Sequence, residues 1–177
     1  MIRKIFAAVL LTAMLFFARE AYAYEYITYQ ANVEGIGWMQ PVKDGEVVGT
    51  TGQARRMEAL IIDFQGGIKY RAHVQNIGWQ NWVYAGEVAG TVGQNLRMEA
   101  IQIEPVGRTT EYFDVYYRAH VENIGWLGWA KNGEPAGTAG ASLRLEALQI
   151  QLVEKDSSFE RGDKPSFYQK IVNAPTV

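Results

Sequence analysis

The chain has no cysteine and only two histidines among its 177 residues. Without cysteine there is no disulfide to stabilise the fold and no thiolate to act as a nucleophile. Two histidines do not make a metal site unless several other ligands converge on them. The stability of the protein must therefore come from its apolar core or from a bound partner.

The chain also lacks an excess of basic residues. It has 17 Lys and Arg against 19 Asp and Glu, and without residues 1–23 these numbers become 14 and 18, a net charge of −4. Nucleic acids and other polyanions are bound by clustered Lys and Arg, so the charge balance argues against them. The length of the remaining chain suits one domain that buries about 70% of its unfolded surface.

Long apolar runs are absent except at the N-terminus. Arg3 and Lys4 precede an apolar run over residues 5–18, and Ala21-Tyr22-Ala23 has the small-x-small pattern of a cleavage site. The run is shorter than the roughly 20 residues that a spanning helix needs. We predict that residues 1–23 are a signal peptide and that the protein is secreted or extracellular, at the cell surface or free of it; the alternative is that the run stays as an uncleaved anchor.

A repeat dominates the rest of the chain. Three copies, at residues 29–65, 70–106 and 117–153, align without internal gaps. Self-similarity of this kind sets the architecture, and it shows which positions tolerate change between copies. Fifteen positions are identical in all three copies, numbered here in the first: Tyr29, Ala31, Val33, Ile36, Gly37, Trp38, Gly45, Glu46, Gly49, Thr50, Gly52, Arg56, Glu58, Ala59 and Ile62.

The Gly-Trp, Gly-Glu…Gly-Thr-x-Gly and Arg-x-Glu-Ala elements of each copy resemble the ChW repeat, a clostridial hydrophobic repeat with a Trp. The resemblance covers nearly all of the chain after residue 28. It implies a module of exported or cell-surface proteins with an adhesive or carbohydrate-linked role, and no catalytic motif comes with it.

Each copy predicts four strands, which in the second copy are residues 70–75, 79–84, 87–91 and 96–104. Alternation places Tyr70, Ala72 and Val74 on one face of the first strand. Twelve strands in three sets predict an all-β, pseudo-threefold closed domain, and we favour a β-prism-like arrangement of four-stranded sheets over a β-trefoil. Residues 154–177 read as a polar tail, docked through Phe167, Tyr168 and Ile171.

Turn residues predict how the strands connect. Gly35, Asn76 and Asn123 occupy the point where the alternation slips, and these residue types reach positive φ at least cost. Asp44-Gly45 and Asn132-Gly133 favour type I′ hairpins. We also expect a hairpin at residues 64–68, and we expect residues 143–153 to close the ring by pairing with residues 27–34.

The five tryptophans fall into two classes. Trp38, Trp79 and Trp126 follow Ile-Gly in every copy, and we favour core packing for them over ligand contact. Trp82 and Trp129 occupy a position where the first copy has Pro41, so we favour exposure and ligand contact there. A flat exposed indole stacks well on the apolar face of a sugar ring.

The recurrent charged pairs are Arg56/Glu58, Arg97/Glu99 and Arg144/Glu146. Residues two apart on a strand share a face, and a partly buried carboxylate needs a partner. We interpret the pairs as structural, with the floor of a ligand pocket as the alternative. His73, His120 and the equivalent Asn32 are expected to be outward polar residues that could hydrogen-bond a glycan.

No Ser/His/Asp arrangement and no phosphate-binding glycine loop is present, so no catalytic residue, metal or cofactor is predicted. The recurrent Glu residues occur at equivalent positions of all three copies, which also argues against an enzyme, because a catalytic site needs one asymmetric arrangement of residues. Binding sites, in contrast, gain avidity when they are repeated. The leading hypothesis is a non-catalytic module for neutral carbohydrate. The alternative is a protein–protein adhesion or scaffold module of cell-surface assemblies.

Overall fold

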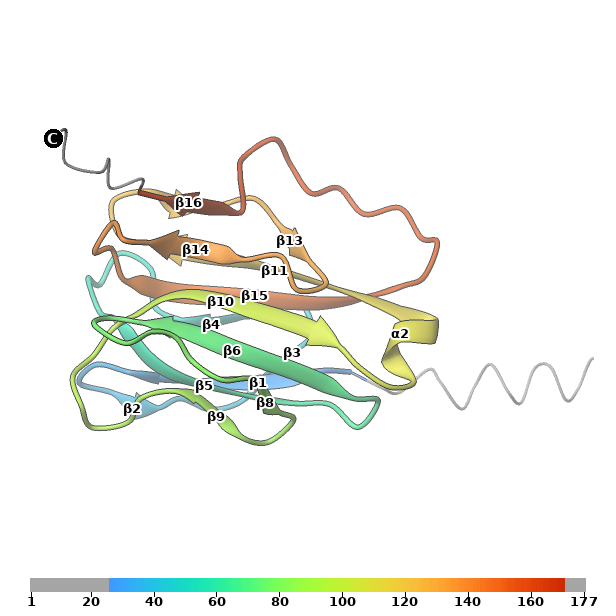
Figure 1. Ribbon diagram of the computed structural model, residues 1–177, viewed down its shortest axis with the longest axis horizontal. Helices are drawn as coiled ribbons and strands as arrows, with labels where there is room; N and C mark the ends of the chain where they lie inside the picture. Colours follow the sequence, from blue (N-terminus) through green and yellow to red (C-terminus); the bar gives the residue numbers. More distant parts are fainter. Residues whose placement is uncertain (1–25, 171–177) are drawn as a thin grey trace, which may run out of the picture.

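The computed structural model describes residues 26–170, which form an all-β molecule of three sheets around one apolar core (Figure 1). The one helix in this part of the chain is α2 (Thr109–Tyr112), a single turn between the second and third copies. No helix among residues 26–170 has the length and apolar character needed to cross a membrane. The predicted signal peptide lies outside the described residues.

Each copy contributes the same series of strands: one long, two very short, one short and one long. The first copy has β1 (Thr28–Val33), β2 (Gly37–Trp38), β3 (Val42–Lys43), β4 (Val47–Gly49) and β5 (Met57–Asp63). The second has β6 (Ile68–Val74), β7 (Gly78–Trp79), β8 (Val83–Tyr84), β9 (Val88–Gly90) and β10 (Met98–Pro105). The third has β11 (Phe113–Val121), β12 (Gly125–Trp126), β13 (Ala130–Lys131), β14 (Ala136–Ala139) and β15 (Leu145–Glu154).

The predicted second strand of each copy is split in two. In the second copy Trp79 lies opposite His73, and Val83 lies opposite Tyr70. Val83 is four residues after Trp79, but Tyr70 is only three residues from His73. The strand with Trp79 and Val83 therefore has one extra residue, a β-bulge that interrupts the ladder of hydrogen bonds. Pro41 lies in the equivalent break of the first copy, where its missing N–H costs no ladder bond.

The sheets exchange strands between copies. β4 of the first copy pairs with β15 of the third, β9 of the second pairs with β5 of the first, and β14 of the third pairs with β10 of the second. Each sheet is therefore built mainly from one copy and completed by the fourth strand of the next. The choice between β-prism and β-trefoil stays a prediction.

Ring closure occurs, but not through the strands that the sequence suggested. We expected residues 143–153 to pair with residues 27–34, whereas β15 pairs with β11 and β4. The reason is that β1 has no free edge: β5 lies on one side of it, and β2 and β3 lie on the other. The edge of β15 is filled instead by β4.

The hairpin expected at residues 64–68 is also wrong. β5 and β6, the strands on either side of it, lie in different sheets. The segment turns sharply, with the Gly67 N–H donating to the Phe64 carbonyl at 3.4 Å, but it carries the chain from one sheet to the next. Residues 106–112 do the same between β10 and β11.

The predicted alternation is confirmed on the first strands. Along β6, Ile68, Tyr70, Ala72 and Val74 are buried, and the residues between them are partly exposed on the outer face. The equivalent inner residues of β1 and β11 join them in a single cluster. The core therefore lies between the three sheets, and each first strand presents every second residue to solvent.

A buried tyrosine ties each copy to its neighbour. The Tyr70 hydroxyl donates to the Glu87 carbonyl and accepts from the Ile62 N–H at 3.0 Å, so it spans the second and first copies. Tyr117 bonds Ile103 at 3.0 Å, and Tyr29 bonds Ile150 at 3.2 Å. Burial raises the pKa of all three phenols, that of Tyr70 to about 12.

The turns follow the prediction in part. Gly35, Asn76 and Asn123 have φ values of 70°, 63° and 61°, which confirms a tight turn at the point of the slip. Asn132 and Gly133 both have positive φ, as a type I′ turn requires, whereas Asp44 does not. The Asp44 carboxylate instead accepts from the Leu152 N–H at 2.7 Å, which supports the join between the first and third copies.

Candidate functional site

The outer faces of the first strands carry the recurrent aromatic and charged side chains. On β6 these outward residues are Lys69, Arg71 and His73. Residues directly opposite on neighbouring strands share a face, so Trp79, which lies opposite His73, also points outward. The same register places Trp126 opposite His120 and Trp38 opposite Asn32.

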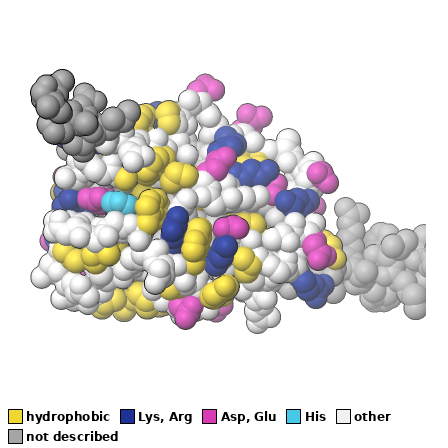
Figure 2. All heavy atoms as spheres, viewed as in Figure 1, with side chains coloured by type: hydrophobic (Ala, Val, Ile, Leu, Met, Phe, Trp, Pro, Cys, Tyr) yellow, Lys and Arg dark blue, Asp and Glu magenta, His cyan; other side chains and the backbone are white. Residues whose placement is uncertain are grey.

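In the second copy these side chains form a ladder of alternating rings and cations. The Arg71 guanidinium lies 4.7 Å from the centre of the Trp82 ring and 5.1 Å from that of Trp79. The Lys69 ammonium lies 4.9 Å from Trp82, and the His73 ring meets Trp79 edge-on at 5.3 Å. Figure 2 shows such a row of alternating hydrophobic and basic side chains over β6, beginning beside a histidine.

The third copy repeats the inner part of this ladder. The Arg118 guanidinium lies 4.8 Å from the Trp126 ring and 4.7 Å from the Trp129 ring. His120 meets Trp126 edge-on at 5.4 Å. Burial lowers the pKa of Arg118 from its ordinary value. Each contact of a cation with an indole contributes roughly 0.5–2 kcal/mol, more where water is excluded.

The division of the tryptophans into core and exposed classes is wrong. Trp38 is 37% exposed, and the other four are partly buried on the outer surface, Trp82 and Trp129 included. The turn at Gly35, Asn76 and Asn123 directs the Ile-Gly-Trp segment outward, away from the core. The first copy lacks a ladder, because Gln30, Asn32 and Pro41 replace the Arg, His and second Trp.

The recurrent Arg/Glu pairs of the second and third copies lie beside the histidine at the end of each ladder, and the first copy has the same pair without a ladder. Glu58, Glu99 and Glu146 are buried, and each accepts a hydrogen bond from its Arg Nε at 2.8, 2.9 and 3.1 Å. His73 Nδ1 lies 3.2 Å from Glu99, and His120 Nδ1 lies 3.2 Å from Glu146. These buried, paired carboxylates fit the structural interpretation of the pairs. Among residues 26–170 no group of three or more residues is arranged to hold a metal ion.

The face of the third copy is covered by the C-terminal segment. The Gly128 and Trp129 N–H groups donate to the carbonyls of Pro165 and Arg161 at 3.0 and 3.2 Å. Phe159 stacks on Tyr116 at 4.1 Å and meets Trp129 edge-on at 5.1 Å. A Cβ at Gly128 would collide with the Lys164 carbonyl, so glycine is required there.

The segment then becomes a strand. β16 (Phe167–Gln169) pairs in parallel with the outer edge of β14, beside which it lies in Figure 1. The Gly137 N–H donates to the Ser166 carbonyl at 2.9 Å, and the Arg161 guanidinium pairs with Glu134. The predicted docking of the tail holds for Phe167, which is partly buried. Tyr168 is 43% exposed, and Ile171 lies outside the described residues.

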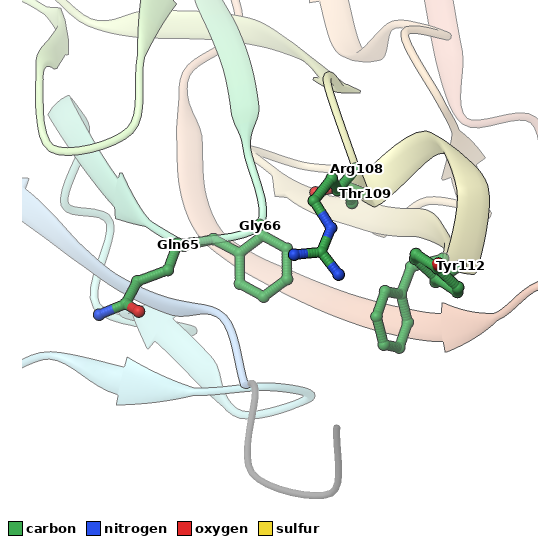
Figure 3. Close-up of a pocket in the computed structure, with 7 residues that line it drawn as sticks. Gln65, Gly66, Arg108, Thr109 and Tyr112 are labelled. Atoms are coloured by element: carbon green, nitrogen blue, oxygen red, sulfur yellow. The ribbon is translucent and has the colours of Figure 1, made fainter. Parts of the chain in front are cut away.

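Three hollows on the surface of residues 26–170 bear on the choice of a site. One of about 470 Å³ is lined by Trp79, Gln80, Asn81, Val83 and Val88 in the second copy. One of about 590 Å³ lies between Trp129, Glu134, Pro135 and the C-terminal segment. The third, between Phe64, Arg108 and Tyr112, holds only about 80 Å³ and is too small for a ligand pocket (Figure 3).

One recurrent exposed residue escaped the sequence analysis. Ile36, Ile77 and Ile124 are identical between copies, yet they are 48%, 51% and 40% exposed. They sit in the turns at the ends of β1, β6 and β11. An apolar residue that is identical in all copies and yet exposed is the signal that identifies these isoleucines. The sequence shows the identity, but the exposure is known only from the structure.

Comparison with known families agrees with the repeats. The family model ChW, clostridial hydrophobic W, matches residues 32–66, 73–107 and 120–154, together more than half of the chain. The chain belongs to the ChW family. ChW repeats are typical of extracellular proteins. No curated protein and no solved structure matches the chain.

Proposed function

We propose that this ChW protein is a secreted, non-catalytic binding module that recognises extended polypeptide segments. One observation carries the proposal: residues 155–170 of the chain itself lie across the tryptophan face of the third copy, held by backbone hydrogen bonds and aromatic contacts. Adhesion or scaffolding between cell-surface proteins is the biological role that suits such a module.

The exposed side chains support a protein partner. Ile36, Ile77 and Ile124, together with Val47 and Val88, leave aliphatic surface in contact with water at equivalent positions of the copies. Recurrent exposed apolar side chains of this kind favour protein–protein contact. Sugar stacking has less support at the ladders, because the guanidinium of Arg71 or Arg118 already lies against both indoles of its copy.

Neutral carbohydrate is the second candidate, and a different residue favours it. Trp38 is the most exposed of the five indoles, and the partly exposed amide of Gln30 shares its face of β1 in place of Arg. Asn32, expected to be an exposed polar residue, is only 8% exposed opposite Trp38, so it is not available to a glycan. An indole beside an amide group can stack on a sugar ring while the amide hydrogen-bonds the hydroxyls of the sugar. This candidate gives one site in the first copy rather than three equivalent sites.

The test uses the full mature chain with Phe159→Ala and Arg161→Ala, which weaken the hold of the C-terminal segment. A synthetic peptide of residues 155–170 should then bind the vacated face and shift tryptophan fluorescence. Failure of the peptide to bind a variant that remains folded contradicts polypeptide recognition. Binding of a neutral polysaccharide that Trp38→Ala abolishes favours the second candidate instead.

A further inference from the structure

The three equivalent strands β4, β9 and β14 differ in what lies on their outer edges. Each contains a glycine with positive φ, Gly49, Gly90 or Gly137, at the same position of the repeat. The backbone N–H of the residue after the glycine points toward the neighbouring long strand. The Thr50 N–H donates to the Glu146 carbonyl, and the Thr91 N–H donates to the Glu58 carbonyl. The glycine N–H therefore points away from the sheet, toward the free edge.

Two of the three edges are closed. The Gly137 N–H donates to the Ser166 carbonyl, and β16 covers the strand. On the edge of β9, the Gln80 side chain accepts from the Gly90 N–H at 2.7 Å and donates to the Gly90 carbonyl at 3.1 Å. A side-chain amide thus occupies the place that a strand backbone takes in the third copy.

The remaining edge is open. The first copy has Met39 where the second has Gln80, and a thioether cannot make this pair of bonds. Among residues 26–170 no group accepts from the Gly49 N–H on its outer side. Exposed edge strands are sites where another chain can add a strand.

We infer that the outer edge of β4 binds an extended segment of a partner polypeptide as an added parallel strand. The inference rests on the proposed function and names its site in the first copy. β16 on β14 shows the geometry: a three-residue strand pairs in register with a strand of the same kind, with Phe167 opposite Gly137. Backbone bonds supply affinity in this mode, and side chains on alternate positions supply specificity.

The surroundings of β4 define the chemistry of the occupant. Val47 on the strand is 45% exposed, and Trp38 is 37% exposed, so apolar or aromatic side chains have surface to cover. Glu46 is exposed just before the strand, and its counterpart Glu134 pairs with Arg161 of the docked segment. The partner segment is therefore extended, carries an aromatic residue opposite Gly49 and has basic flanks, as residues 164–170 do.

The crossing seen at residues 164–165 does not extend to the first copy. It requires Gly128, and the equivalent residue is Gln40. The added strand on β4 must therefore approach by another path, which restricts the recognised segment to a short strand. This difference also explains why one copy holds the tail.

The test titrates a peptide of residues 164–170 into the full mature protein and into two variants. Met39→Gln introduces the cap of the second copy into the first and should weaken binding about tenfold or more, because it replaces the backbone bonds of the edge. Gln80→Met removes the cap of the second copy and should raise the stoichiometry from one peptide to two. Both residues occur naturally at this position of the repeat, and thermal melts check that each variant is folded.

The outcomes separate this inference from the proposed function. Binding that neither substitution changes, or binding only to the variant with the vacated third copy, overturns the inference and leaves polypeptide recognition standing. If the peptide binds neither the edge of β4 nor the vacated face of the third copy, both this inference and the proposed function are overturned. Self-association of the protein alone that Met39→Gln abolishes assigns the edge to a second copy of the chain and overturns the partner segment.

Discussion

At the residue scale, the repeated tyrosine joins neighbouring copies through its hydroxyl rather than through its ring alone. The Tyr70 ring is fully buried, and its hydroxyl bonds Ile62 on β5 and Glu87, which directly precedes the exchanged strand β9. Phenylalanine would fill the same space but would leave the Ile62 N–H and the Glu87 carbonyl without this partner. The hydroxyl explains why all three copies have tyrosine.

Tyr70→Phe should lower the free energy of unfolding by about 1–3 kcal/mol, the cost of leaving buried polar groups unpaired. Urea denaturation at neutral pH measures it, with the exposed Tyr84→Phe as the matched control. The pKa of Tyr70 is raised to about 12 from 10.0, so its contribution is complete below pH 10 and is lost as the pH rises toward 12. The alkaline loss of stability should therefore be smaller in Tyr70→Phe, and equal losses would contradict the linkage.

At the element scale, the short exchanged strands depend on a glycine. Gly49, Gly90 and Gly137 have φ of 96°, 98° and 121°, and a Cβ at each would collide with a backbone carbonyl of the long strand beside it. At Gly49 the obstructing atoms belong to Glu146 and Ala147 of the third copy. This close approach lets β4 join β15 and so closes the ring.

Gly49→Ala should destabilise the protein by about 2–4 kcal/mol, because strain at positive φ adds to a collision in the packed sheet. Gly52→Ala is the control, since it has a φ of 71° but open space around the position. It should cost about 1 kcal/mol from the backbone alone. Equal losses of melting temperature in the two variants would mean that the close approach contributes nothing.

The sequence allowed the long strands and their buried faces to be predicted, because alternation and the repeat both report them. It did not report the exchange, because a strand as short as Val47–Gly49 has the same pattern whichever long strand it joins. The outward direction of Trp38, Trp79 and Trp126 does not follow from periodicity alone. It depends on the register of the hairpin, which places Trp79 opposite the outward His73. Gly128, present where other copies have Gln40 and Asn81, was the available sign of the docked tail.

At the scale of the whole molecule, strand exchange makes every copy incomplete by itself. The third copy needs β4 from the first, the first needs β9 from the second, and the second needs β14 from the third. The tyrosine hydroxyls cross the same three joins, and the core is a single cluster. No copy can leave the ring without exposing a long strand edge and part of the shared core.

The three copies should therefore unfold as one unit. Thermal unfolding followed by far-ultraviolet circular dichroism and by tryptophan fluorescence should give coincident transitions. Deletion of residues 117–153 removes β14 and β15, which leaves β4 unpaired and opens the edge of β10 that faces away from β6, so the fragment should be unfolded or should oligomerise by pairing its open edges. Sedimentation and circular dichroism of the fragment decide the matter. A stable, monomeric two-copy fragment would mean that the copies form an open array held by local contacts, because only then could β4 and β10 do without the third copy.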